Sequence, residues 1–128
     1  MIGFIKSRLS SFKHAFSGWW LVIRTQQNAW IHALATVCVV ILAAWLRLGV
    51  RDWSVLLLTI AMVWTAEFLN TALEAVVDLA SPQQHPQARV GKDVGAAAVL
   101  ITAFSAVVIG CLILGPPLYA RISSLFNH

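Results

Sequence analysis

Residues 53–79 read WSVLLLTIAMVWTAEFLNTALEAVVDL, and this stretch decides the fold. It is largely apolar and longer than the about 20 residues that a helix needs to cross a membrane core. The whole chain is similarly apolar, because 59% of its 128 residues are hydrophobic and only 11% are charged. Soluble domains carry about 25% charged residues, and a domain this small cannot bury so much apolar surface. We therefore predict an integral membrane protein rather than a soluble, disordered or disulfide-rich one.

Two further apolar runs predict a bundle of three membrane-spanning helices. The predicted spans cover about residues 30–48, 53–79 and 93–114. A short polar turn at 47–52 separates the first two spans, and a loop at 80–91 with Ser-Pro and His-Pro pairs separates the last two. The sequence Gly115-Pro116-Pro117 is expected to end the third span.

Residues 4–24 predict a helix of a different kind. Their apolar side chains recur at spacings of three and four residues, and the basic side chains Lys6 and Lys13 lie off this stripe. A basic amphipathic helix with aromatic anchors is expected to lie in the membrane surface. The predicted fold class is therefore all-α, with one surface helix and three transmembrane helices in a single membrane domain covering residues 1–128.

The distribution of basic residues predicts the orientation in the membrane. The N-terminal segment and the 80–93 loop together hold six Lys and Arg residues, whereas the 47–52 turn and the C-terminal tail hold three. Because basic residues accumulate on the cytoplasmic side, we expect the N-terminus in the cytoplasm. The net charge of +4 then indicates anionic lipid headgroups as partners, and no nucleic acid.

Four polar side chains gather on one face of the second span. They are Glu67, Asn70, Glu74 and Asp78. At about 100° per residue they fall at about 0°, 300°, 340° and 20° around the helix axis. An acid within the hydrocarbon costs roughly 2.5–3.5 kcal/mol on insertion scales. Polar groups that join neighbouring helices are one explanation, but a narrow stripe of three acids and an amide favours a functional site.

The residue types in this stripe and beside it could provide a general base, a cation site and an anion site. One carboxylate in a low-dielectric environment can act as a general base, and a second can bind a divalent cation. Lys92 and Asp93 open the third span at the same membrane level, where a helix N-terminus and a lysine favour phosphate. A lysine that snorkels beside an N-terminal acid is the alternative interpretation of that pair. The glycine-rich phosphate-binding motif GxxxxGK[ST] is absent from the sequence.

These residues resemble the signature of the prokaryotic diacylglycerol kinase and undecaprenol kinase family. The central match is AEFLNTALEAVVD at 66–78, and it continues through His85-Pro86 and through KDVGAAAVL at 92–100. Upstream, the similarity covers SFKHA at 11–15 and then Arg24-Thr25, Asn28 and His32. It extends over roughly residues 8–115.

The resemblance implies a homotrimer in the bacterial inner membrane. It also implies phosphorylation of a lipid alcohol, either undecaprenol or diacylglycerol, with ATP as the phosphoryl donor and Mg²⁺ as the cofactor. Glu67 would be the catalytic base, supported by Asn70, and Glu74 would hold Mg²⁺ on the ATP phosphates. The other nucleotide-binding positions implied by the resemblance are His14, Gln83, Gln84, His85, Lys92 and Asp93.

One position departs from the family pattern. Many relatives have a glutamate where this chain has Gln26, and in them that side chain helps to bind the metal. Gln26 can offer a carbonyl oxygen to the metal, but it brings no charge. The Ser-Pro, His-Pro and Lys-Asp pairs, together with Arg24-Thr25 and Asn28, resemble the undecaprenol kinase branch more than the enterobacterial branch.

Two other functions compete with a lipid kinase. The acid stripe could line a pore in a small oligomer that conducts protons or cations, although this reading gives Lys92 and Asp93 no role. A non-catalytic membrane interaction protein is the third reading. It predicts that exchanging Glu67 and Glu74 for glutamine is harmless or stabilising.

Overall fold

The fold is known from a computed structural model that describes residues 1–83 and 85–126. These residues form four α-helices and no strand. The helices are α1 (Ile2–Thr25), α2 (Gln27–Trp45), α3 (Val50–Ala80) and α4 (Pro86–Phe126). Three of them, α2, α3 and α4, are long and apolar enough to cross a membrane. The predicted all-helical fold with three candidate spans is therefore confirmed.

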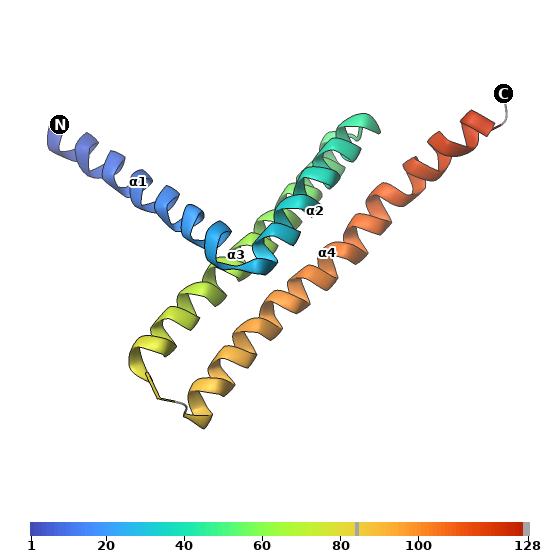
Figure 1. The fold of residues 1–128 in the computed structure, drawn as a ribbon. Coiled ribbons are helices and arrows are strands. Elements are labelled where there is room, and N and C mark those ends of the chain that lie inside the picture. The colour runs from blue at the N-terminus through green and yellow to red at the C-terminus, as the bar shows by residue number, and fades with distance from the viewer. Residues whose placement is uncertain (84, 127–128) are drawn as a thin grey trace.

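Figure 1 shows α3 and α4 as a long antiparallel hairpin, with α2 running along the upper half of α3. The first helix, α1, leaves this bundle at a wide angle. Two small clusters of buried side chains join the helices. Val22, Ala29 and Trp64 connect α1, α2 and α3, whereas Ala43, Leu56 and Leu114 connect α2, α3 and α4.

The turn between α2 and α3 is built from local backbone hydrogen bonds. The Leu48 amide donates to the Ala43 carbonyl at 3.2 Å, and the Arg47 amide donates to the Ala44 carbonyl at 3.1 Å. This pair of bonds is a Schellman motif, in which the residue after the helix adopts the left-handed conformation. That residue is Arg47, with a φ of 55°. Glycine is the usual residue here, so the predicted polar turn is present but its left-handed residue had no signal in the sequence.

A close approach between α3 and α4 depends on Gly95. A Cβ atom added to Gly95 would clash with the amide oxygen of Asn70 and would lie 3.2 Å from a methyl carbon of Leu73. Small residues allow membrane helices to pack at short distances. Gly95 therefore sets the spacing of α4 from the polar face of α3.

The ends of α4 differ from the predicted third span. The helix begins at Pro86 instead of near Asp93, because proline is well tolerated in the first turn of a helix. It also continues through Pro116 and Pro117 to Phe126, although Gly115-Pro116-Pro117 was expected to end it. Proline removes a backbone donor but already has a helical φ angle, so the helix can continue at the cost of hydrogen bonds.

Candidate active site between α2, α3 and α4

The polar face of α3 opens into a cavity of about 370 Å³. Its walls combine polar side chains from α2 and α3 with small and apolar residues of α4. The polar residues in its lining are Gln26, Asn28, His32, Glu67, Asn70 and Glu74. Glu67 is almost fully enclosed, with 2% of its surface exposed. The first acid of the predicted stripe is thus buried in the wall of a cavity.

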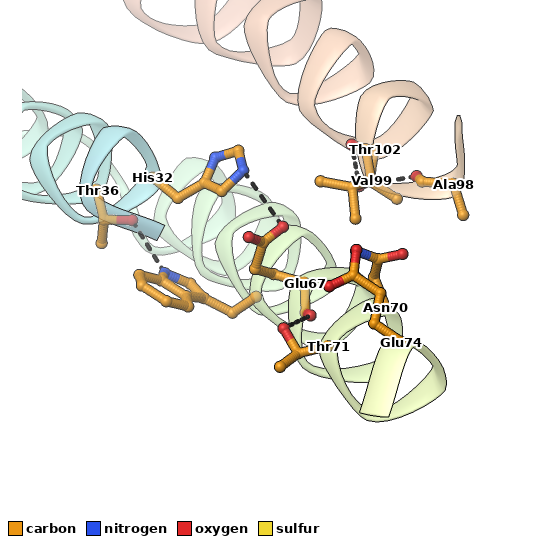
Figure 2. A network of polar contacts seen from close by, with 10 residues as sticks. His32, Thr36, Glu67, Asn70, Thr71, Glu74, Ala98, Val99 and Thr102 are labelled. Atoms are coloured by element: carbon orange, nitrogen blue, oxygen red, sulfur yellow. Dashed lines mark hydrogen bonds and ion pairs between the residues drawn. The ribbon is translucent and has the colours of Figure 1, made fainter. Parts of the chain in front are cut away.

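Glu67 faces His32 of α2, as Figure 2 shows. The Nε2 atom of His32 lies 3.9 Å from Oε2 of Glu67. One turn further along α2, Thr36 accepts a hydrogen bond of 3.2 Å from the indole N–H of Trp64. Since α2 and α3 are antiparallel, these two contacts form adjacent rungs between the helices. Their spacing fixes the register of α2 against α3 at the site.

The Glu74 carboxylate is held by two amide groups. Asn70 donates from Nδ2 to Oε1 of Glu74 at 3.0 Å, and Gln26 donates from Nε2 to Oε2 at 3.1 Å. Gln26 lies between α1 and α2, so its hydrogen bond connects that junction to α3. The amide oxygen of Asn70 is buried and makes no hydrogen bond in the described part of the chain.

A second, larger cavity of about 590 Å³ lies where α3 turns into α4. Its lining includes Gln83, His85, Lys92 and Asp93. Two ion pairs border it. The Lys92 ammonium lies 2.5 Å from the Asp78 carboxylate, and Arg89 lies 3.8 Å from Asp93 within α4. Since Asp78 follows Glu74 by one turn of α3, the two cavities are neighbours along one helix face.

The structure divides the residues singled out from the sequence into two groups. Gln26, Glu67, Asn70 and Glu74 line the first cavity, and Gln83, His85, Lys92 and Asp93 line the second. Among the described residues, His14 lines neither of these cavities. It lies on the exposed face of α1, where its Nε2 is 3.3 Å from Ser10 Oγ. Gln84 is outside the described residues.

The contacts that His32 and Arg89 make at the site were not predicted from the sequence. His32 was noted for its resemblance to the family, but no local spacing connects it to Glu67, because the two residues lie on different helices. Arg89 was counted only as a loop charge. Its pairing with Asp93 follows the four-residue spacing that brings side chains together on a helix. The contact could therefore be predicted only once α4 was known to begin at Pro86.

A model of the prokaryotic diacylglycerol kinase family matches residues 13–114. The chain belongs to this family. This membership confirms the predicted resemblance and the enzyme class, a phosphotransferase that acts on an alcohol group. Together with the three candidate spans, it makes the chain a multi-pass membrane protein.

Family members named undecaprenol kinase and family members named diacylglycerol kinase are both similar to the chain. It is 39% identical over 108 residues to an undecaprenol kinase of Bacillus subtilis, covering 84% of this chain and 88% of the relative. It is 43% identical over 111 residues to a diacylglycerol kinase of Synechocystis, covering 86% of this chain and 63% of the relative. A diacylglycerol kinase of Escherichia coli is 34% identical to the chain over 93 residues, covering 67% of this chain and 76% of the relative.

Proposed function

We propose that this protein transfers the γ-phosphoryl group of ATP to the hydroxyl group of a membrane lipid, undecaprenol or diacylglycerol. The observation that carries this proposal is the buried Glu67 carboxylate in the wall of a cavity that it shares with Glu74. Seven residues of helix separate the two acids, a rise of about 10 Å. At this distance one acid can contact the acceptor hydroxyl group while the other lies near the nucleotide phosphates.

Glu67 acts as the base and accepts the proton of the lipid hydroxyl. A base must reach the proton that it removes, and the cavity gives a hydroxyl group access to this carboxylate. Asn70 supports the site through its hydrogen bond to Glu74. The nucleotide lies toward the second cavity, where Gln83, His85, Lys92 and Asp93 contact it. His14 and Gln84 complete the proposed nucleotide-binding set.

The donor set fits Mg²⁺ that is bound mainly by the nucleotide. Among the described residues, no group of three or more His, Cys, Asp and Glu side chains could hold a metal by itself. Mg²⁺ often takes one or two carboxylates together with substrate phosphates and water. Glu74 supplies such a carboxylate. The unpartnered amide oxygen of Asn70 faces Gly95 of α4, so it would reach a metal beside Glu74 only after the amide turns. When bound there with ATP, Mg²⁺ would neutralise charge on the phosphates.

Gln26 is the second proposed metal-binding position. Its amide nitrogen points to Glu74, so its carbonyl oxygen would reach a metal only after the amide turns. The Gln26 side chain thus helps to orient the Glu74 carboxylate. If its amide turns, it adds only a neutral ligand to the metal. We expect weaker Mg²⁺ binding than a glutamate at this position would provide.

The proposed assembly is a homotrimer in the bacterial inner membrane. Many large apolar side chains of the spans are exposed in the single chain, for example Leu100 at 71% and Phe104 at 69%. Such side chains need lipid or a neighbouring protomer around them. The N-terminus is proposed to be cytoplasmic, with α1 lying in the membrane surface. Arg24 packs over the Trp20 ring at 5.6 Å from its centroid, a pairing suited to the interface.

A kinase assay on a panel of lipids tests the function. Purified protein in detergent is given Mg-ATP with undecaprenol, with diacylglycerol or with no lipid. We expect phosphate transfer to a lipid alcohol, with undecaprenol the better acceptor because of the sequence pairs that resemble its branch. No transfer to any lipid alcohol, combined with proton or cation flux into liposomes without ATP, would replace the kinase by the conducting oligomer.

A further inference from the structure

His32 has an unusual place in the site. Its Nε2 atom is buried and has no hydrogen-bond partner in the described part of the chain, yet it lies 3.9 Å from Oε2 of Glu67. This separation is too long for a direct hydrogen bond. A buried polar atom without a partner is unfavourable. Both side chains line the same cavity, so a third polar atom in that cavity, to one side of the pair, could bond to both of them.

The charge of Glu67 determines which form of His32 fits. A nitrogen lone pair directed at a carboxylate oxygen would be repelled, whereas an N–H group would be attracted. His32 therefore presents Nε2–H to the cavity in either its neutral or its protonated form. It is a hydrogen-bond donor beside a hydrogen-bond acceptor. A hydroxyl group, which both accepts and donates, is complementary to this pair.

The position of the His32 ring is fixed by Trp64. The two rings meet edge to face, with centroids 6.5 Å apart and an interplanar angle of 70°. Trp64 is itself held by its hydrogen bond to Thr36 and by Trp19 of α1, whose ring centroid is 4.7 Å away. A ring supported in this way can keep Nε2–H directed into the cavity without a bound partner.

We infer that His32 and Glu67 together bind the acceptor hydroxyl, with His32 donating from Nε2–H to the hydroxyl oxygen while Glu67 accepts the hydroxyl proton. This inference rests on the lipid kinase function proposed above. Hydrogen bonds of about 2.9 Å and 2.7 Å to the two side chains can both reach one oxygen, because their combined length exceeds the 3.9 Å between Nε2 and Oε2.

The chemical step then balances around this oxygen. The O–H bond breaks and its proton passes to Glu67. The oxygen forms a bond to the γ-phosphorus of ATP, while the bond from that phosphorus to the β–γ bridging oxygen breaks and ADP leaves. His32 keeps its proton and holds the attacking oxygen in place, which is the kind of positioning on which phosphoryl transfer depends.

The test compares variants of His32 in steady-state kinetics with the lipid and the nucleotide varied separately. His32→Phe keeps the ring and removes the donor. We expect kcat/KM for the lipid to fall about 10- to 100-fold, as for a lost hydrogen bond to a buried group. The KM for ATP should stay within about twofold, since the nucleotide contacts other residues. His32→Gln, whose amide nitrogen can reach the position of Nε2, should recover part of the loss.

Trp30→Phe is the matched control on the same helix. Like His32→Phe it removes a ring N–H group and keeps an aromatic ring, but the Trp30 side chain is 63% exposed and does not line the cavity of Glu67. The kcat/KM of this variant for the lipid should stay close to that of the unmodified protein. An equal loss in Trp30→Phe and His32→Phe would contradict the role of His32 as a donor to the hydroxyl group. A rise in the KM for ATP as large as the rise in the KM for the lipid in His32→Phe would also contradict a role confined to the hydroxyl group.

Two further outcomes separate the inference from the function on which it rests. An unmodified protein without lipid kinase activity would overturn the proposed function itself. An active protein whose lipid kinetics are unaffected by His32→Phe would overturn only the role of His32. If His32→Phe does not fold, His32→Asn replaces it. Its shorter amide should give a lower kcat/KM for the lipid than His32→Gln, and equal values would contradict the inference.

Discussion

Asn70 donates a hydrogen bond of 3.0 Å to Glu74, one turn further along α3, while its amide oxygen faces Gly95 of α4. The Asn70 side chain therefore takes part both in the packing of α3 against α4 and in the orientation of the Glu74 carboxylate. A change in the spacing of α3 and α4 must disturb the Asn70 amide, and with it one of the two hydrogen bonds that hold Glu74.

Gly95→Ala tests this connection. The added Cβ would clash with the Asn70 amide oxygen, so α4 or Asn70 has to move. We expect a loss of about 1–3 kcal/mol of stability, typical of overpacking, together with lower kinase activity. Thermal unfolding in detergent and a lipid phosphorylation assay measure both effects. Gly110→Ala on the same helix is the control, because nothing lies within 4 Å of its added Cβ. Equal behaviour of the two variants would contradict the predicted clash.

Glu67→Gln is expected to abolish phosphoryl transfer. The amide keeps the size of the side chain but cannot accept the hydroxyl proton, so kcat should fall by at least about 100-fold. The fold and the assembly should survive, which size-exclusion chromatography in detergent can show. Asp52→Asn, in the first turn of α3 at the opposite end of that helix, is the control and should remain active. Unchanged activity in Glu67→Gln would remove Glu67 as the base.

The sequence predicted the helical elements well where composition alone determines them. Long apolar runs must be helical in a membrane, because their backbone groups have no water to bond to. The end of α4 was not predictable in this way. Pro116 and Pro117 interrupt hydrogen bonding, but their fixed backbone angle is compatible with a helix. The left-handed Arg47 is a similar case, since nothing in its side chain favours that conformation.

The candidate site was predictable along α3 but not across helices. Helical periodicity places Glu67, Asn70 and Glu74 on one face, and the three residues do line one cavity. Contacts from other elements depend on how the helices pack. The pairing of Glu67 with His32 and the hydrogen bond from Gln26 to Glu74 therefore had no signal in local spacing. In each contact the partner from the other element, His32 or Gln26, had been noted only because of the family resemblance.

Lys92→Met should affect nucleotide binding much more than stability. The Lys92 and Asp78 side chains are 39% and 64% exposed, and ion pairs this open to solvent stabilise a fold by about 1 kcal/mol or less. Loss of a cation near the phosphates should raise the KM for ATP about tenfold. Kinetics at varied ATP concentration measure this effect. A large fall in thermal stability with an unchanged KM for ATP would assign Lys92 to the fold instead.

Gln26→Glu should change the dependence of activity on Mg²⁺. In the present chain the Gln26 amide donates to Glu74, whereas a glutamate would place a second carboxylate beside the first. Two carboxylates repel one another without a cation and bind Mg²⁺ more tightly with one. We therefore expect a lower half-saturating Mg²⁺ concentration and a protein that is less stable without Mg²⁺ but stabilised more by its addition.

Activity and thermal unfolding, each titrated with Mg²⁺, measure the two effects of Gln26→Glu independently. Gln27→Glu provides the matched control, because it adds the same charge one residue later, at an exposed position that does not line the cavity of Glu74. It should leave the Mg²⁺ dependence unchanged. If Gln26→Glu and Gln27→Glu shift the Mg²⁺ dependence equally, the effect comes from the net charge of the membrane surface and not from a ligand beside Glu74.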